Sequence, residues 1–231
     1  MIYITGDLHG EIERFEEKNM KKLKKGDILI VCGDFGFIWN NSPEEQKNLN
    51  KLKSKKFTIL FIDGKHENFD LLDQYPIIEW NGGKVHKIGD NIYHLMRGQI
   101  FNIDNKKILA FGGGESPDKE YRIEAGTWWE RELPNIDEMK MCLDNLEKND
   151  KEVDYVITHE PPFDIKKLID RNIKSINPLE SFLEQLERKI KFKKWYFGCM
   201  HIDRKITSRH QAVFFNVVPV EVVVKKGLFK R

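Results

Sequence analysis

The segment Ile2-Tyr3-Ile4-Thr5-Gly6-Asp7-Leu8-His9-Gly10 joins a short apolar run to an aspartate and a histidine that stand two residues apart. The apolar run predicts a buried strand, and the glycines predict a tight loop at its end. From such a loop the Asp7 carboxylate and the His9 imidazole can both turn onto one metal ion. Open α/β folds bind their ligands just beyond the carboxyl ends of strands, so this segment predicts an α/β fold with a ligand site there.

Four further polar clusters follow apolar runs in the same manner. They are Gly33-Asp34 after residues 27–31, Gly64-Lys65-His66-Glu67 after residues 57–62, His159 after residues 155–158, and Gly198-Cys199-Met200-His201 after residues 195–197. Any one of these residues alone is usually a helix cap or a turn residue. The ordered set, each member at the end of a strand, indicates a metal site built from several loops.

This order of motifs resembles that of the calcineurin-like metallophosphoesterases, which carry Asp-x-His, Gly-Asp, Gly-Asn-His-Glu/Asp, a later histidine and Gly-His-x-His. The resemblance covers almost the whole chain and is strongest to small single-domain members from bacteria and phages. It implies a single domain over residues 1–231. It also implies an α/β fold in which two mixed β-sheets pack as a sandwich flanked by helices.

The resemblance further implies two metal ions bridged by one aspartate. The first ion would be held by Asp7, His9, Asp34 and His201. The second would be held by Asp34, residue 65, His159 and residue 199. His66 would contact the scissile phosphate or the leaving group. Mixed oxygen and nitrogen donors suit Mn²⁺, Fe or Zn²⁺ better than Ca²⁺.

The sequence departs from the family pattern in the second set. Lys65 stands where the family has asparagine, and Cys199 stands where it has the first histidine of Gly-His-x-His. Glu160 follows His159, at a position where relatives often carry a small residue or cysteine. We therefore expect one firmly bound divalent ion, with the second ion weakly bound or absent.

Lys65 has two interpretations that the residues alone leave open. A charged ammonium has no lone pair and cannot be a ligand. It could replace the second ion as a positive partner of Asp34, balanced in part by Glu160, or it could turn to solvent and leave a decayed site. Cys199 could be a soft thiolate ligand. A small buried residue in a lost ligand position is the favoured interpretation of Cys199.

Arg97, Arg122, Trp128 and Trp129 lie in segments that could overhang the strand ends. A guanidinium there could bind a phosphate and a tryptophan could stack on a base, so Arg97 and Arg122 are candidate substrate-binding residues. Core tryptophans and surface arginines are an equally good interpretation. The run of glycines at 112–114 is only a weak phosphate-cradle signal, because no helix clearly starts there.

The composition limits the class of partner. Of 231 residues, 39 are Lys or Arg and 37 are Asp or Glu, which gives a net charge of +2. This balance does not favour a nucleic-acid partner, and the lysine clusters at 21–25 and 189–194 are interpreted as solvated faces. We expect a phosphorylated small molecule or a nucleotide as substrate. The sequence gives no signal for the oligomeric state.

Two observations bear on location. The 3 cysteines are far apart and odd in number, so they form no disulfide framework. No apolar run approaches the ~20 residues of a membrane span. We expect a cytoplasmic protein with no membrane partner.

The expected elements alternate at first and then change. Strands are predicted at 2–4, 27–31, 57–62, 85–88, 92–95, 99–103, 107–111, 155–158, 195–197, 212–217 and 220–224. Helices are predicted at 11–20, 43–55, 137–148 and 178–189. Ser42 is the predicted N-cap of the second helix, and Asp104-Asn105 is the predicted turn of a hairpin.

These observations support three functions. The preferred one is a metal-dependent phosphoesterase that hydrolyses a phosphate mono- or diester, with Asp34, Lys65 and His66 as catalytic residues. The alternative is a catalytically inactive protein that uses the same fold to bind a phosphorylated ligand or a protein partner. A nucleic-acid-processing factor is a third, which the balanced charge disfavours.

Overall fold

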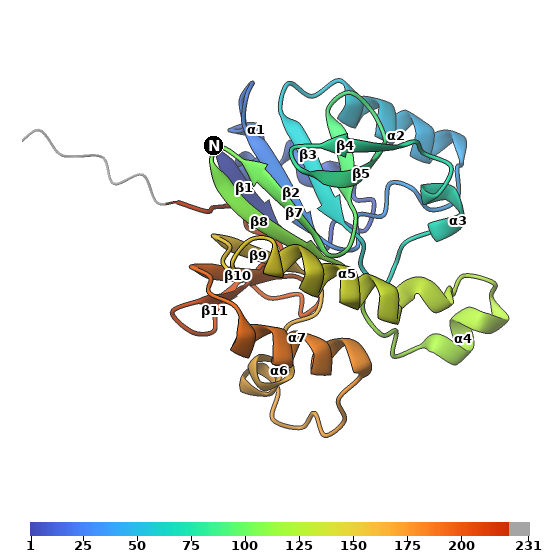
Figure 1. Cartoon of the computed structure of the whole chain (residues 1–231). Coiled ribbons are helices and arrows are strands. Elements are labelled where there is room, and N and C mark those ends of the chain that lie inside the picture. The colour runs from blue at the N-terminus through green and yellow to red at the C-terminus, as the bar shows by residue number, and fades with distance from the viewer. Residues whose placement is uncertain (222–231) are drawn as a thin grey trace, which may run out of the picture.

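The computed structural model describes residues 1–221 of the chain. Two mixed β-sheets lie face to face, and helices cover the outer face of each (Figure 1). Within the described residues one sheet has seven strands and the other has six. The predicted fold class, two mixed sheets flanked by helices, is confirmed.

The seven-stranded sheet has the order β13-β1-β2-β3-β6-β5-β4. Its strands are β1 (Ile2–Thr5), β2 (Ile28–Cys32), β3 (Thr58–Ile62), β4 (Ile77–Trp80), β5 (Gly83–Lys87), β6 (Ile92–Leu95) and β13 (Val218–Pro219). Strands β1, β2, β3 and β6 run parallel, so three carboxyl ends that carry polar clusters lie at one edge. The outer strands β13, β5 and β4 pair antiparallel.

The six-stranded sheet has the order β11-β12-β10-β9-β8-β7. Its strands are β7 (Gln99–Ile103), β8 (Lys106–Phe111), β9 (Tyr155–Thr158), β10 (Lys194–Phe197), β11 (Arg204–Lys205) and β12 (His210–Ala212). The core strands β8, β9, β10 and β12 are parallel. Asp104 and Asn105 both have positive φ, at 48° and 58°, as a two-residue type I′ hairpin turn requires, so the predicted turn is confirmed.

The helical elements are η1 (Ile12–Glu16), α1 (Lys18–Lys21), α2 (Pro43–Lys53), α3 (Phe69–Leu72), α4 (Lys119–Glu124), η2 (Glu130–Glu132), α5 (Ile136–Glu147), α6 (Phe163–Ile169) and α7 (Pro178–Lys189). Leu49 and Leu52 of α2 pack on the outer face of the seven-stranded sheet. Helices α5, α6 and α7 pack on the outer face of the other sheet. A third apolar cluster fills the space between the sheets.

Several predicted elements differ from the structure. The predicted helix 11–20 is a 3₁₀ turn and a four-residue helix, because the backbone of Glu17 is extended, with ψ at 146°. The predicted strand 212–217 is replaced by β12 and β13, and residues 222–224 of the last predicted strand lie outside the described residues. Strand β4 and helices α3, α4 and α6 were not predicted. None of the helices within residues 1–221 is long and apolar enough to cross a membrane.

Candidate metal centre

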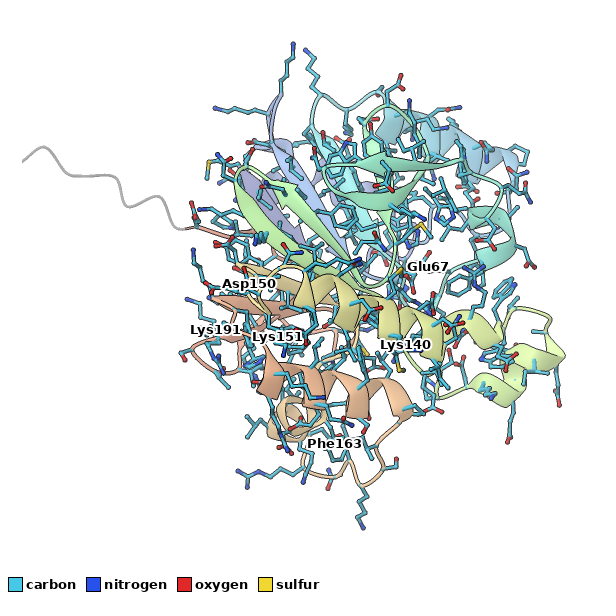
Figure 2. All side chains as sticks on the ribbon, viewed as in Figure 1. Glu67, Lys140, Asp150, Lys151, Phe163 and Lys191 are labelled. Atoms are coloured by element: carbon cyan, nitrogen blue, oxygen red, sulfur yellow. The ribbon has the colours of Figure 1, made fainter. Side chains whose placement is uncertain are left out.

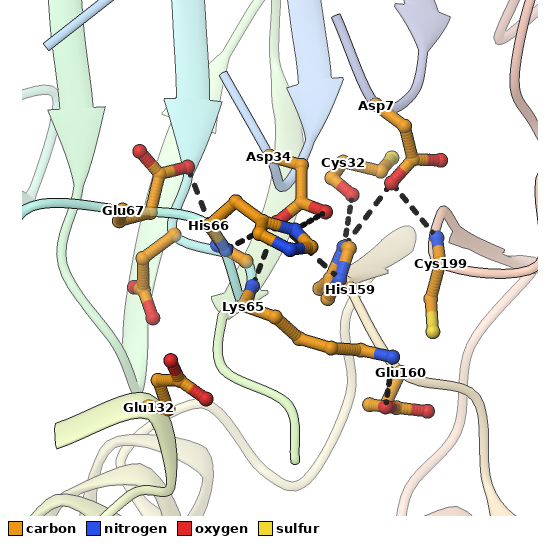
Figure 3. Close-up of polar contacts among 12 residues, drawn as sticks. Asp7, Cys32, Asp34, Lys65, His66, Glu67, Glu132, His159, Glu160 and Cys199 are labelled. Atoms are coloured by element: carbon orange, nitrogen blue, oxygen red, sulfur yellow. Dashed lines mark hydrogen bonds and ion pairs between the residues drawn. The ribbon is translucent and has the colours of Figure 1, made fainter. Parts of the chain in front are cut away.

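Five loops meet at the carboxyl ends of β1, β2, β3, β9 and β10, and together they form one polar site (Figure 3). The first three loops come from the seven-stranded sheet and the last two come from the six-stranded sheet. The site therefore lies where the two sheets adjoin. This is the location that the pattern of strand-end polar residues predicts.

The backbone of the site is strained in a consistent way. Asp7, His9, Asp34, Cys199 and His201 all have positive φ, between 45° and 62°. A non-glycine residue in this left-handed region costs roughly 1–2 kcal/mol, and such residues concentrate at functional sites. The fold accepts this cost at five positions that bring side chains to one point.

Two glycines allow the loops to approach closely. A Cβ atom on Gly64 would overlap Oδ1 of Asp34, and a Cβ atom on Gly33 would overlap the ring of His159. Gly33 also has a φ of +88°. These two positions require glycine because a site side chain occupies the space where a side chain would begin.

Three overlapping groups of donors converge in the site. They are Asp7, His9 and His201; His9, Asp34 and His66; and Asp7, Asp34 and His159, with the donors of each group within 4.8 Å of one another. Nε2 of His9 lies 3.2 Å from Nε2 of His201 and 3.8 Å from Oδ2 of Asp34. The four residues expected to hold the first ion are thus gathered in one cluster, joined through His9.

His159 and Asp7 carry buried polar atoms that lack a partner. Nδ1 of His159 donates to the carbonyl of Cys32 at 3.0 Å, which leaves the lone pair on Nε2. Nε2 of His159 and Oδ2 of Asp7 are buried without a hydrogen-bond partner in the described part of the chain. An unpaired buried polar group costs about 1–3 kcal/mol, so the donor set fits a cation that is shared with Asp34, whose Oδ1 lies 3.7 Å from Nε2 of His159.

The two carboxylates differ in proton affinity. Burial raises the pKa of Asp7 to about 7. Burial would also raise the pKa of Asp34, but His159 and the hydrogen bond from His66 outweigh it and lower that pKa. Oδ1 of Asp34 accepts the backbone N–H groups of Lys65 at 2.7 Å and His66 at 2.8 Å. Burial lowers the pKa of His9, which favours the neutral imidazole that binds metals.

Lys65 does not turn to solvent. Its side chain is 14% exposed, and Nζ lies 3.2 Å from Oε1 of Glu160, which is 1% exposed. The other oxygen of Glu160 lies 2.9 Å from Nζ of Lys166 in α6, and Lys166 also contacts Glu180 in α7. The ammonium of Lys65 is therefore paired with Glu160 and not with Asp34, which receives only the backbone N–H of Lys65.

The charges of this pair support each other. Burial alone would raise the pKa of Glu160, but Lys65 and Lys166 lower it to about 2. Burial alone would lower the pKa of Lys65, but the Glu160 carboxylate and a hydrogen bond to the Cys199 sulfur outweigh burial and raise that pKa. Lys65, Glu160, Lys166 and Glu180 form a row of alternating charges, which we call the Lys65–Glu180 row.

Cys199 contributes its backbone to the site. Its N–H donates to Oδ1 of Asp7 at 3.0 Å. Burial raises the pKa of the Cys199 thiol well above its usual range, and a neutral thiol is a poor metal ligand. This environment favours the interpretation of Cys199 as a residue in a lost ligand position.

Arg97 and Arg122 are already bound to the protein. Arg97 is buried and donates to Asp63 at 2.8 and 2.6 Å. Arg122 is buried, lies 2.7 Å from Glu132, and donates to the carbonyl of Lys65 at 3.0 Å. Both guanidinium groups brace the loops of the site, and the structure places neither at an open edge where a phosphate would bind directly.

Glu67, the last residue of the motif after β3, has a structural role that the sequence did not predict. Oε1 of the buried Glu67 accepts the backbone N–H of Phe35 at 2.9 Å, which ties the loop after β3 to the loop after β2. Figure 2 shows Lys151 and Lys191 on the left side of the molecule, away from Glu67. Part of the lysine-rich segment at 189–194 is thus remote from the site. Glu67 is the last residue of the motif Gly64-Lys65-His66-Glu67, but the motif does not indicate which backbone groups its carboxylate binds.

The chain is 25% identical over 234 residues to the lariat debranching enzyme of Schizosaccharomyces pombe. That alignment covers 89% of this chain and 48% of the relative, so the chain spans about half the length of that protein. A model of the calcineurin-like phosphoesterases matches residues 1–198. Since that match extends from β1 to the end of β10, the chain belongs to the calcineurin-like phosphoesterase family.

Proposed function

We propose that this protein is a metal-dependent phosphoesterase that hydrolyses a phosphate mono- or diester. One observation carries the proposal: Asp and His donors from both sheets converge, and a buried oxygen of this set, Oδ2 of Asp7, lacks a partner in the described residues. Such an arrangement is costly without a cation and favourable with one.

Asp7, His9, Asp34 and His201 would hold one divalent ion, either Mn²⁺, Fe or Zn²⁺. A bound ion of this kind supplies charge that neutralises phosphate oxygens and lowers the pKa of water. Nδ1 of His159 donates to Cys32, which fixes the ring with its free nitrogen toward Asp34. This support keeps the donor set in place before the ion binds.

His66 is the residue best placed to act on the substrate. Its Nδ1 lies 2.9 Å from Oδ2 of Asp34, which orients the ring and leaves Nε2 for another partner. As an imidazolium held by Asp34, His66 can donate a proton from Nε2 to a phosphate oxygen or to the leaving group. The substrates we propose are phosphorylated small molecules or nucleotides. We also propose a reducing cytoplasm as the compartment, because the 3 cysteines are unpaired.

The Lys65–Glu180 row supports a single firmly bound ion. A second ion would need ligands where the Lys65 ammonium and the neutral Cys199 thiol lie, and the ammonium would repel it. The same row also favours a second candidate function. A protein that has replaced two ligands by a buried ion pair can serve as a binder of phosphorylated ligands without turnover.

Metal analysis together with turnover tests the proposal. Protein purified without chelator should contain about one divalent ion per chain and should hydrolyse p-nitrophenyl phosphate or its diester slowly. Asp34→Asn should lose both the ion and the activity. Asp154→Asn removes a carboxylate that pairs with Lys193 and is not part of the metal centre. This control variant should keep both the ion and the activity. Two tightly bound ions would contradict the single-ion proposal, and a metal-loaded protein without turnover would favour the binder.

A further inference from the structure

A groove of about 360 Å³ opens directly beside the metal centre. His9 and His66 form one end of it, and the segment 36–42 with the first turns of α2 forms the rest. The groove thus joins the proposed phosphate position to a space large enough for part of a substrate. The residues that line the groove therefore indicate which chemical group is attached to the phosphate.

One wall of the groove is a fixed aromatic ring. The backbone N–H of Trp39 donates to Glu45 at 2.8 Å, and its carbonyl accepts from Asn68 at 2.7 Å. The ring meets the edge of Trp129 with centroids 5.8 Å apart. Because both backbone and ring are held, a partly exposed Trp39 offers a stacking surface at little cost in entropy.

The charge of the groove is unsuited to a second phosphate. Glu44 and Glu45 line it, and its lining contains no lysine or arginine among the residues described. The carboxylate of Glu45 already accepts the N–H groups of Trp39, Asn40 and Asn41. Those three backbone N–H groups are therefore not available to an anion, and the Glu44 and Glu45 carboxylates repel one.

The remaining lining can form hydrogen bonds with a neutral group. Asn40, Ser42 and Asn48 contribute amide and hydroxyl groups. An amide can donate and accept at once, as the edge of a nucleobase requires. An aromatic wall, neutral polar groups and excess negative charge together select a flat, uncharged substituent.

We propose that this groove binds one ester substituent of the phosphate and selects an uncharged planar group of the nucleoside class. Trp39 stacks on the ring, and Asn48 binds its polar edge. This inference rests on the proposed phosphoesterase function for the position of the phosphate. It makes Trp39 and Asn48 specificity-determining residues and Glu44 the residue that excludes anionic substituents.

Calorimetric binding to the Mn²⁺-loaded protein tests the proposal, with inorganic phosphate and adenosine monophosphate as probes. Adenosine monophosphate should bind at least tenfold more tightly. Trp39→Ala should remove about tenfold of that affinity, as expected for the loss of one stacked base, and leave phosphate affinity unchanged. Asn48→Ala, at a half-buried position of α2, should weaken the binding of adenosine monophosphate alone, and it tests the groove even if Trp39→Ala does not fold. Trp80→Ala, in the edge strand β4, is the matched control and should change neither affinity.

Equal affinity for the two probes, or an equal loss of both in Trp39→Ala, would overturn the proposal. A second arm tests charge: 4-carboxyphenyl phosphate should bind less tightly than phenyl phosphate, and Glu44→Gln should remove the difference. An unchanged difference in Glu44→Gln would refute the role of Glu44. Hydrolysis reports separately on the proposed function. Hydrolysis without a preference for nucleoside substrates would contradict only this inference. Tighter binding of adenosine monophosphate that depends on Trp39, without hydrolysis, would contradict only the proposed phosphoesterase function.

Discussion

Changing Glu160 to glutamine should destabilise the protein far more than its single carboxylate suggests. Glu160 is 1% exposed and lies between Lys65, at 3.2 Å, and Lys166, at 2.9 Å. Glu160→Gln keeps the shape of the side chain and removes the charge. Lys166 retains Glu180 at 2.5 Å, but no other carboxylate of the described residues lies within 4.0 Å of the Lys65 ammonium.

The size of the destabilisation depends on Lys65, which has no second carboxylate within residues 1–221 to replace Glu160. The Coulomb attraction between charges 3.2 Å apart is about 5 kcal/mol at an effective dielectric constant of about 20. Breaking a buried pair by removing one partner costs roughly 3–5 kcal/mol, because the other charge is left buried and unpaired. We expect Glu160→Gln to lower the free energy of unfolding by about 3 kcal/mol. Lys65→Met should cost less, about 1–2 kcal/mol, because Glu160 keeps Lys166.

A double-mutant cycle in urea, with chelator present, measures the coupling directly. Lys65→Met with Glu160→Gln should cost less than the two single changes together, which gives a coupling free energy of about 2 kcal/mol. Lys193 and Asp154 form the matched control, since Nζ and Oδ1 lie 2.6 Å apart but Lys193 is 67% exposed. That surface pair should couple by less than about 1 kcal/mol. Equal coupling in the two pairs would refute our account of Lys65 and would restore the reading in which it turns to solvent.

Three further outcomes are expected. Lys65→Asn together with Cys199→His should raise the metal content from about one ion per chain toward two, as measured by elemental analysis, and an unchanged content would argue against these positions as lost ligands. His201→Gly should be more stable to urea than His201→Ala by about 1 kcal/mol, because φ is 49°, and equal stabilities would show that the loop relaxes. Burial lowers the pKa of His86 to about 4, so the unfolded chain takes up a proton on His86 more readily than the folded protein does. The free energy of unfolding should therefore be highest above about pH 6.5 and should fall by at most about 3 kcal/mol as the pH drops toward 4. His86→Gln should flatten that part of the pH profile of unfolding, and an identical profile in the variant would exclude His86 as the cause.

The strands that carry the site could be predicted from sequence because each is a short run with at most one residue that is not fully buried. Residues 58–62 and 155–158 are apolar or β-branched on both faces, as a parallel strand between two layers must be. Their polar successors then fall at one edge by topology alone. Strand β4 was missed because its apolar run, Ile-Ile-Glu-Trp, is only four residues long and lies exposed or half-buried at the edge of the sheet.

The partners of the charged residues could not be predicted in the same way. Lys166 lies 101 residues from Lys65, on a seven-residue helix that carries little sequence signal, and it meets Glu160 only because α6 packs beside α7. Arg97 was predicted to bind phosphate, but in the structure its guanidinium group is paired with Asp63. Ion pairs between distant segments depend on side-chain packing, and no periodic pattern encodes them.

The three departures from the family pattern form one physical unit. Lys65 without Glu160 would leave a buried ammonium unpaired, and Glu160 without Lys65 would add an anion beside Asp7 and Asp34. The Lys65–Glu160 pair has no net charge. It can hold the loops together as a second ion would, but it does not supply the positive charge of that ion. The phosphate then faces about two fewer positive charges than it would in a centre with two divalent ions. Each 1.36 kcal/mol of lost transition-state stabilisation is a tenfold loss in rate. We therefore propose that the ion pair which stabilises the loops also makes hydrolysis slow.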